Sequence, residues 1–171
     1  MAGEMTEEPE DAPCGPLTQA NAQIHDGHEE AILRLIEDLT ELDIPGARRG
    51  LRSLSIDMKA HLAVEDASTH QVYGALTDHP RGAAPALFEA DHVSHAKVMR
   101  ACEEALAKVD GAAPDLRRQV VLIHPLFYRL RSVLEHHTLR EQRFLYPRLD
   151  AELSPGEIEV LVTELTTPGE S

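Results

Sequence analysis

Tryptophan is absent from this chain of 171 residues, and aromatic side chains make up only 4% of it. A folded core must therefore be built from aliphatic side chains, and a hydrophobic content of 42% is sufficient for one such core in a single domain. Only two cysteines are present, Cys14 in a Pro/Gly-rich segment and Cys102 within a helical pattern. Two cysteines so placed exclude a disulfide framework.

Long apolar runs and an excess of positive charge are also missing. No apolar stretch approaches the roughly 20 residues that a membrane-spanning helix requires. The first residues are acidic, unlike the basic and apolar start of a secretory signal. The net charge of -14 argues against bulk attraction to nucleic acid or to an anionic membrane. We therefore expect a cytoplasmic protein with neither kind of partner, whereas the sequence does not indicate an oligomeric state.

Apolar residues recur at steps of three and four along most of the chain, which is the spacing of amphipathic helices. With the turn signals between them, they predict four long helices and one short helix, at residues 18–42, 47–76, 85–109, 115–149 and about 154–165. Thr18 is the expected N-cap of the first helix, and Pro45-Gly46 are expected to separate it from the second. Pro125 should kink or break the fourth helix. Ser154-Pro-Gly-Glu157 is typical of a capping box.

Four amphipathic helices with short connections predict an all-α fold, an up-down-up-down four-helix bundle followed by a short C-terminal helix. These bounds divide the chain into three parts. Residues 1–17 form a disordered acidic leader, residues 18–150 form the bundle, and residues 151–171 form the short helix and a tail.

Two of the ten histidines begin the same pattern, His61-Leu-Ala-Val-Glu65 and His137-Thr-Leu-Arg-Glu141. A spacing of four residues puts an imidazole and a carboxylate on one helical face, here the apolar face that points into the core. An unpaired carboxylate is expensive to bury there. Two inward-facing His/Glu pairs on two helices therefore indicate a metal site.

The first and third helices add histidines on their own apolar stripes, His25 with His28 and His92 with His95. At one level of a bundle, His25 and His92 would join the two His/Glu pairs. Four histidines and two glutamates exceed the needs of one tetrahedral zinc and suit two metal ions bridged by the carboxylates. His28 and His95 lie one turn further along and remain open as the true ligands, as extra ligands, or as hydrogen-bond partners of ligands.

In this arrangement the chain resembles the hemerythrin-like family, also called the HHE cation-binding domain. The family pattern is His, then His-x-x-x-Glu, then His, then His-x-x-x-Glu on four successive helices. The matching residues, within about residues 18–150, are His25, His61, Glu65, His92, His137 and Glu141. The segment Glu141-Gln-Arg-Phe-Leu-Tyr-Pro147 is also typical of the family's last helix. The resemblance implies a non-haem centre of two iron ions that cycle between ferrous and ferric states, with an oxo or hydroxo bridge.

The third and fourth helices depart from the oxygen-carrying hemerythrins. Those proteins have His-x-x-x-His on the third helix and end with an aspartate one residue further on. This chain instead has His92 and His95, three residues apart, and a glutamate at Glu141. It is therefore more similar to the carboxylate-richer branch of the family, and the resemblance does not imply reversible oxygen transport.

The second helix departs from the family in another way. Glu65 is followed by Asp-Ala-Ser-Thr-His70-Gln-Val-Tyr73 rather than by the usual apolar-aromatic-Pro ending. These polar residues can open that side of the site, or they can bring His70 or Tyr73 close to a metal as an additional ligand or a hydrogen-bond partner. By helical pattern alone His70 lies off the apolar stripe, which favours a structural or exposed position. Tyr73 and Tyr146 are more often packing residues, although a phenol beside two irons can ligate one or donate a proton.

The resemblance implies a protein that binds or reacts with oxygen, nitric oxide or peroxide. Its function would be oxidant detoxification, such as peroxide decomposition, or sensing. A non-enzymatic iron-binding module for storage, delivery or sensing is an alternative, as is a di-iron oxygenase acting on a small organic substrate. If the protein is an enzyme, it is a catalase-like or oxygen-dependent oxidoreductase. The expected partners are small diatomic or peroxide ligands, and the sequence does not indicate which residue is catalytic.

Overall fold

A computed structural model of the chain describes residues 14–167, and every regular element in this range is helical. Four helices are long, namely α1 (Pro16–Thr40), α2 (Ile44–Ala67), α4 (Pro85–Ala107) and α5 (Leu116–Arg140). The shorter elements are α3 (Thr69–Ala75), a π-helix η1 (Glu141–Leu145), α6 (Tyr146–Glu152) and α7 (Pro155–Thr166). The prediction of an all-α fold is confirmed for the described residues.

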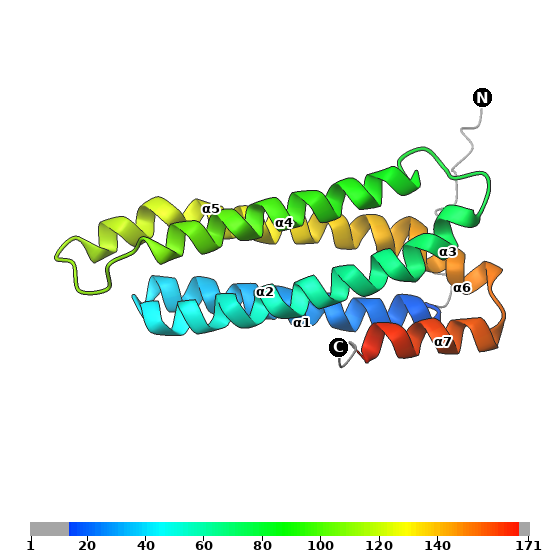
Figure 1. Cartoon of the computed structure of the whole chain (residues 1–171), viewed down its shortest axis with the longest axis horizontal. Helices are drawn as coiled ribbons and strands as arrows, with labels where there is room; N and C mark the ends of the chain where they lie inside the picture. Colours follow the sequence, from blue (N-terminus) through cyan, green and yellow to red (C-terminus); the bar gives the residue numbers. More distant parts are fainter. Residues whose placement is uncertain (1–13, 168–171) are drawn as a thin grey trace, which may run out of the picture.

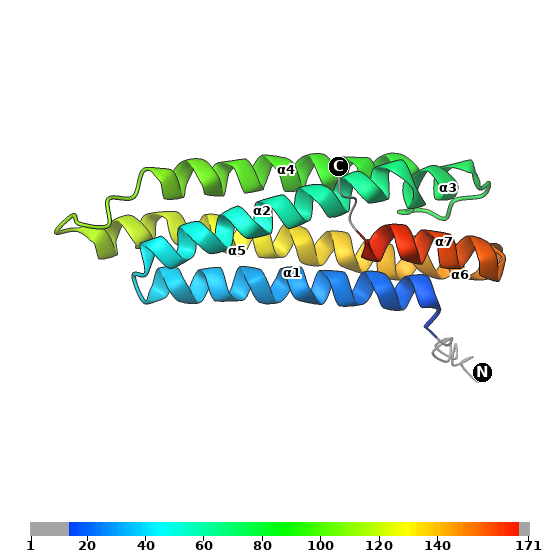
Figure 2. The ribbon, with the colours of Figure 1, turned by 60° about the horizontal axis from the view of Figure 1, so that its bottom comes forward.

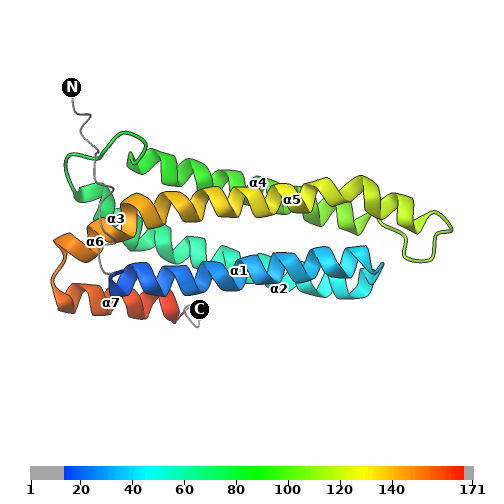
Figure 3. The ribbon, with the colours of Figure 1, turned by 180° about the vertical axis from the view of Figure 1, so that it is seen from behind.

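The four long helices lie lengthwise beside one another, α1 next to α2 and α4 next to α5 (Figures 1 and 3). Because α1 also contacts α5 and α2 also contacts α4, the four helices enclose a common interior. The short helices α3, α6 and α7 gather at one end, where α7 lies along α1 (Figure 2). Within the described range, no helix combines the length and the apolar character that a bilayer crossing requires.

The interior contains two separate apolar clusters, of which one fills the end of the bundle where α1 turns into α2. It is built mainly from aliphatic residues such as Leu39, Leu54 and Leu130. The other cluster lies at the end that carries α3, α6 and α7, and it includes Phe88 and Leu161. Four segments of the chain run through both clusters, namely α1, α2 with α3, α4, and α5 with η1 and α6. In each segment, buried histidines or glutamates separate the residues of one cluster from those of the other. The polar level is thus sealed by apolar packing on both sides.

The start of α1 differs from the prediction. The helix begins at Pro16, not after an N-cap at Thr18, and Gly15 is its N-cap. Its first amide groups donate to a distant carboxylate: the backbone N–H groups of Leu17 and Thr18 each lie 3.0 Å from an oxygen of Asp150 in α6. A Cβ atom on Gly15 would lie only 2.2 Å from the Asp150 Cγ, so glycine leaves room for this cap. The remainder of the predicted leader, residues 1–13, lies outside the described residues, as do residues 168–171.

The connection between α1 and α2 is also shorter than predicted. Pro45 and Gly46 do not separate the helices but lie in the first turn of α2, which begins at Ile44. Proline is tolerated there because its missing N–H group has no partner in the first turn. The Asp43 side chain caps this turn by accepting a hydrogen bond from the Gly46 N–H at 2.9 Å.

The predicted helix over residues 47–76 is interrupted, and the predicted break at Pro125 does not occur. Ser68 adopts a non-helical backbone conformation (φ -124°, ψ -84°), so α2 ends at Ala67 and α3 starts anew at Thr69. In contrast, α5 remains helical across Pro125. The irregularity of the last segment falls instead on η1, which begins at Glu141. The capping box of Ser154 and Glu157 at the start of α7 is confirmed.

Candidate metal centre

The structure brings all six residues of the sequence pattern together in the interior. The two carboxylates, Glu65 and Glu141, are completely buried. The four imidazoles around them are contributed by α1, α2, α4 and α5, and each belongs to a residue that is at most 6% exposed. These residues are His25, His61, His92 and His137.

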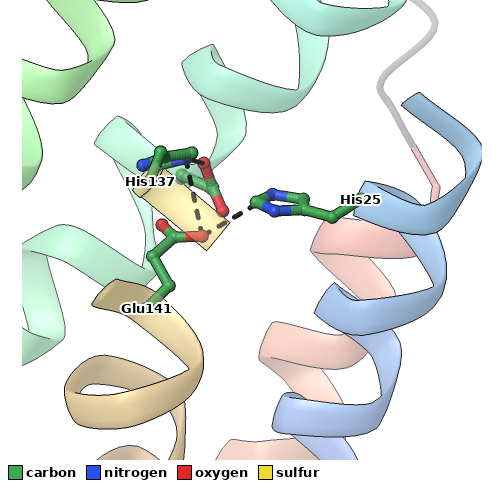
Figure 4. Close-up of side chains that lie close together, drawn as sticks. His25, His137 and Glu141 are labelled. Carbon is green, nitrogen blue, oxygen red and sulfur yellow. Dashed lines mark ion pairs between the residues drawn. The ribbon is translucent and has the colours of Figure 1, made fainter. Parts of the chain in front are cut away.

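Glu141 lies between two of the imidazoles. Figure 4 shows the rings of His25 and His137 beside its carboxylate, with the Oε2 atom 3.6 Å from His25 Nε2 and 3.5 Å from His137 Nε2. Glu141 lies one regular helical turn after His137, because its backbone N–H group donates to the His137 carbonyl oxygen, and a π-helix begins at Glu141. Single-turn π-helices are frequently found at functional sites.

Glu65 occupies the other side of the centre. Its Oε1 atom is 3.1 Å from His61 Nε2, while its Oε2 atom is 3.3 Å from His92 Nε2 and 3.8 Å from His137 Nε2. The hydroxyl of Tyr146 donates a hydrogen bond to Oε1 at 2.7 Å. Each carboxylate therefore faces imidazoles from more than one helix.

Two sets of four residues bring their ligand atoms within 4.8 Å of one another. The first set comprises His25, Glu65, His137 and Glu141, and the second comprises Glu65, His70, His92 and Glu141. Ligand atoms about 2.1 Å from one ion are separated by at most about 4.2 Å. Side-chain shifts of a few tenths of an ångström would therefore let either set hold a metal ion. Both carboxylates belong to both sets.

Several buried polar atoms of the cluster have no hydrogen-bond partner within the part of the chain that the structure describes. They include Glu65 Oε2, His92 Nε2 and both ring nitrogens of His137. An unsatisfied buried polar atom costs about 1–3 kcal/mol, so such atoms are rare without a reason. Although these atoms lie close together, they do not point at one another as a donor and an acceptor do. A cation among them would satisfy them, and the residues present fit a metal.

The two carboxylates differ in their electrostatics. Burial opposes the charge of Glu65, but the field of His61 and the close approach of the His137, His61 and His92 imidazoles together hold the pKa of Glu65 well below its usual value. Burial and the nearby charge of Glu65 raise the pKa of Glu141 well above its usual value. Without a cation, the cluster therefore favours one charged and one protonated carboxyl group. Positive charge between them would allow both to ionise.

Three polar residues that the sequence analysis did not single out support the cluster. The side-chain amide of Asn21 donates to Glu141 Oε2 at 3.1 Å, His25 Nδ1 lies 2.5 Å from the Thr138 hydroxyl, and His92 Nδ1 lies 2.9 Å from Asp66 Oδ1. Asn21 could have been found, because it lies one turn before His25 on the same stripe. Thr138 and Asp66 could not have been found from the sequence. Each lies beside a site residue in the chain, and each contacts the cluster only through a histidine on another helix.

His28 and His95 are buried but belong to neither compact set. The His28 ring centroid lies 5.4 Å from that of His61, and the His95 centroid lies 5.2 Å from that of His137. Burial lowers the pKa of His28 to about 4 and that of His95 to about 3. Both side chains therefore border the centre as neutral imidazoles.

Of the two positions left open for His70, the structure shows the one close to the carboxylates. Its side chain is only 8% exposed, and its Nε2 atom lies 3.5 Å from Glu141 Oε1. The interruption at Ser68 changes the helical phase, so the stripe of α2 does not extend to α3. Tyr73 is buried on α3, but its hydroxyl donates to the carbonyl oxygen of Ala83 at 3.0 Å, away from the carboxylates.

A cavity of about 690 Å³ borders the second set of ligands. Its lining includes His70 and His92 together with Phe88, Asp66 and Glu89. The cavity therefore brings open space to the rings of His70 and His92 on this side of the centre. Cys102 belongs to neither set, and both Cys102 and the exposed Cys14 are free, as the sequence predicted.

No model of a known protein family matches the chain. No curated protein is similar enough to count as a match. The inference of function therefore rests on the cluster itself, a buried His/Glu centre that can hold a metal ion and that lies among the helices of residues 14–167.

Proposed function

We propose that the chain is a hemerythrin-like protein that binds two iron ions inside an up-down-up-down four-helix bundle. The observation that carries this proposal is that two compact sets of ligand atoms share Glu65 and Glu141. A carboxylate has two oxygen atoms and can bridge two ions, so shared carboxylates favour two adjacent metal positions over one. Carboxylates and histidines on facing helices build di-iron sites in other bundles. The proposed ligands are His25, His61, Glu65, His92, His137 and Glu141, with an oxo or hydroxo bridge.

The chemistry of the donors supports iron. The centre offers imidazoles and carboxylates, a combination that suits iron, whereas the thiol of Cys102 lies outside both ligand sets. One tetrahedral zinc would use only four of these residues and leave buried polar atoms unsatisfied. The resemblance of the sequence pattern to the hemerythrin-like family selects iron over manganese.

The proposed activity is oxidant detoxification, such as peroxide decomposition, or the sensing of oxygen, nitric oxide or peroxide. A bound iron pair supplies electrons and Lewis acidity for this chemistry. The protein contributes apolar packing at both ends of the polar level, a cavity that borders His92, and a proton on the Tyr146 hydroxyl next to Glu65. Burial and the charge of Glu65 raise the pKa of Tyr146 well above its usual value, so this hydroxyl keeps its proton.

Metal analysis of protein loaded anaerobically with ferrous iron tests the centre. We expect two irons per chain, and an absorption band of a bridged ferric pair after exposure to air. The double substitution Glu65→Gln and Glu141→Gln should abolish uptake, because neither amide supplies an anionic bridge. The matched control is Glu135→Gln, an exposed position on α5, which should leave uptake unchanged. A single bound zinc, or equal uptake in the double variant, would overturn the proposal.

A second experiment tests the reaction separately from the metal. The iron-loaded protein is mixed with peroxide, oxygen or nitric oxide while its absorption spectrum is recorded. We expect turnover of peroxide or a spectral change with at least one of the three. If two irons are bound and none of the three has an effect, the oxidant function is wrong. The protein would then be a non-enzymatic iron-binding module, with a large metal-dependent rise in melting temperature.

A further inference from the structure

The short helix α3 brings into the centre a histidine that the four-helix pattern does not include. The ring of His70 stacks on that of His92, with centroids 4.6 Å apart, and its Nε2 atom lies 3.5 Å from Glu141 Oε1. We propose that His70 is a metal ligand that completes the second metal position together with Glu65, His92 and Glu141. This inference rests on the proposed two-metal centre.

The distribution of imidazoles between the two sets favours this role. The first set contains His25 and His137, and His61 lies beside it, with its Nε2 atom 2.9 Å from that of His25. Without His70, the second set would retain only the imidazole of His92 besides the two shared carboxylates. With His70, each position has at least two imidazoles and access to both bridging carboxylates.

One carboxylate lies behind both imidazoles of the second set. Asp66 Oδ1 is 2.9 Å from His92 Nδ1 and 3.3 Å from His70 Nδ1. Histidine ligands commonly direct one ring nitrogen at a carboxylate and the other at the metal. The shared Asp66 therefore leaves the Nε2 atoms of both rings to face Glu65 and Glu141, at 3.3 Å for His92 and 3.5 Å for His70.

The interruption of the helix explains how His70 comes into the centre. In a continuous α-helix, a residue five positions after Glu65 would point about 140° away from it. The helix instead stops at Ser68, whose hydroxyl donates to the carbonyl oxygen of Val64 at 2.7 Å. The new helix is held in place by the buried Tyr73, and Phe88 lies against the His70 ring with the centroids 5.6 Å apart. These contacts of the protein itself place His70 beside the carboxylates.

Metal titration of the full chain with ferrous iron, and with cobalt(II) as a spectroscopic probe, tests this role. The wild type should bind two ions. His70→Ala should keep one tight site and bind the second ion at least ~10-fold more weakly, since losing even an indirect partner of a ligand costs that much. The control His136→Ala removes an exposed imidazole on α5 and should bind two ions with unchanged affinity.

Added imidazole distinguishes ligation from a purely structural role. Since the cavity of about 690 Å³ borders His70, free imidazole can enter the space left in His70→Ala. It should restore the second ion and the wild-type cobalt spectrum. Weaker binding that imidazole does not restore would make His70 a positioning residue and overturn the proposal, as would unchanged binding of two ions. If His70→Ala does not fold, judged by circular dichroism, His70→Asn keeps a planar polar side chain at this position for the same titration. A wild type that binds fewer than two ions would instead refute the proposed function.

Discussion

The hydroxyl of Tyr146 donates a hydrogen bond across 2.7 Å to Glu65 Oε1, and both side chains are completely buried. Tyr146 directly follows the π-helix η1 (Glu141–Leu145), in which hydrogen bonds join residues five apart. This wider turn allows Glu141 and Tyr146, five positions apart, to face the same interior. A regular α-helix would separate their directions by about 140°. One local irregularity therefore brings the hydroxyl that supports Glu65 to the same interior as Glu141.

Tyr146→Phe should destabilise the metal-free protein by about 1–3 kcal/mol, because it removes the donor from a buried carboxylate while preserving the packing of the ring. Denaturant unfolding in the presence of a chelator measures this change. The control Tyr128→Phe removes the hydroxyl of an exposed ring on α5 and should leave the unfolding free energy unchanged. Equal effects of the two substitutions would show that the hydrogen bond to Glu65 contributes nothing.

Asn21→Ala should weaken metal binding about 10–100-fold, the usual effect of removing a hydrogen-bond partner of a ligand. The Asn21 amide helps Glu141 to ionise by opposing the effects that raise the pKa of this carboxyl group. Without it, the metal must displace a more firmly held proton. Competition with a chelator measures the affinity, and Gln23→Ala, an exposed position on the same helix, is the control. An affinity equal to that of the control would refute this role.

Gly15 and Asp150 should behave as a coupled pair. Asp150→Ala removes the cap of α1 and should cost about 1 kcal/mol. Gly15→Ala places a Cβ atom 2.2 Å from the Asp150 Cγ, so it must displace the same cap. In a double-mutant cycle, the second substitution should therefore cost much less once the first is present. Purely additive unfolding free energies would contradict the contact.

The metal-free protein should lose stability as the pH falls from about 6.5 toward 4. Burial lowers the pKa of His28 from 6.5 to about 4 and that of His95 to about 3, so the folded state keeps both rings neutral in this range. The unfolded chain binds these protons at its ordinary pKa, and acidification therefore favours unfolding. Above pH 6.5 both states are neutral at these two positions, and they contribute no pH dependence.

Melting temperatures recorded with a chelator between pH 8 and pH 5 check this expectation. His28→Gln removes one histidine whose pKa is lowered in the folded state. The melting temperature should then depend less steeply on pH, because the unfolded chain takes up fewer protons, by about one at most. His136→Ala removes an exposed imidazole and should not alter it. A His28→Gln profile parallel to that of the wild type would contradict the buried neutral state of His28.

The sequence by itself determined the all-helical class, the boundaries of α4 and α7 to within about two residues, and the six residues that meet in the interior. These features follow from local geometry. A helical period of 3.6 residues converts a spacing of four into a shared face, and an apolar stripe shows which face is buried. Glu65 with His61 and Glu141 with His137 could therefore be found without knowing how the helices pack.

Only the tertiary structure decided the features that depend on contacts between distant segments. The cap of α1 comes from Asp150, more than a hundred residues away, which no local pattern at Thr18 can indicate. His70 reaches the cluster because Ser68 resets the helical phase, and α5 passes through Pro125 without a break. The order of residues along one helix shows which side chains share a face. Which of them meet across the interior depends on the level at which neighbouring helices pack and on where each helix is interrupted.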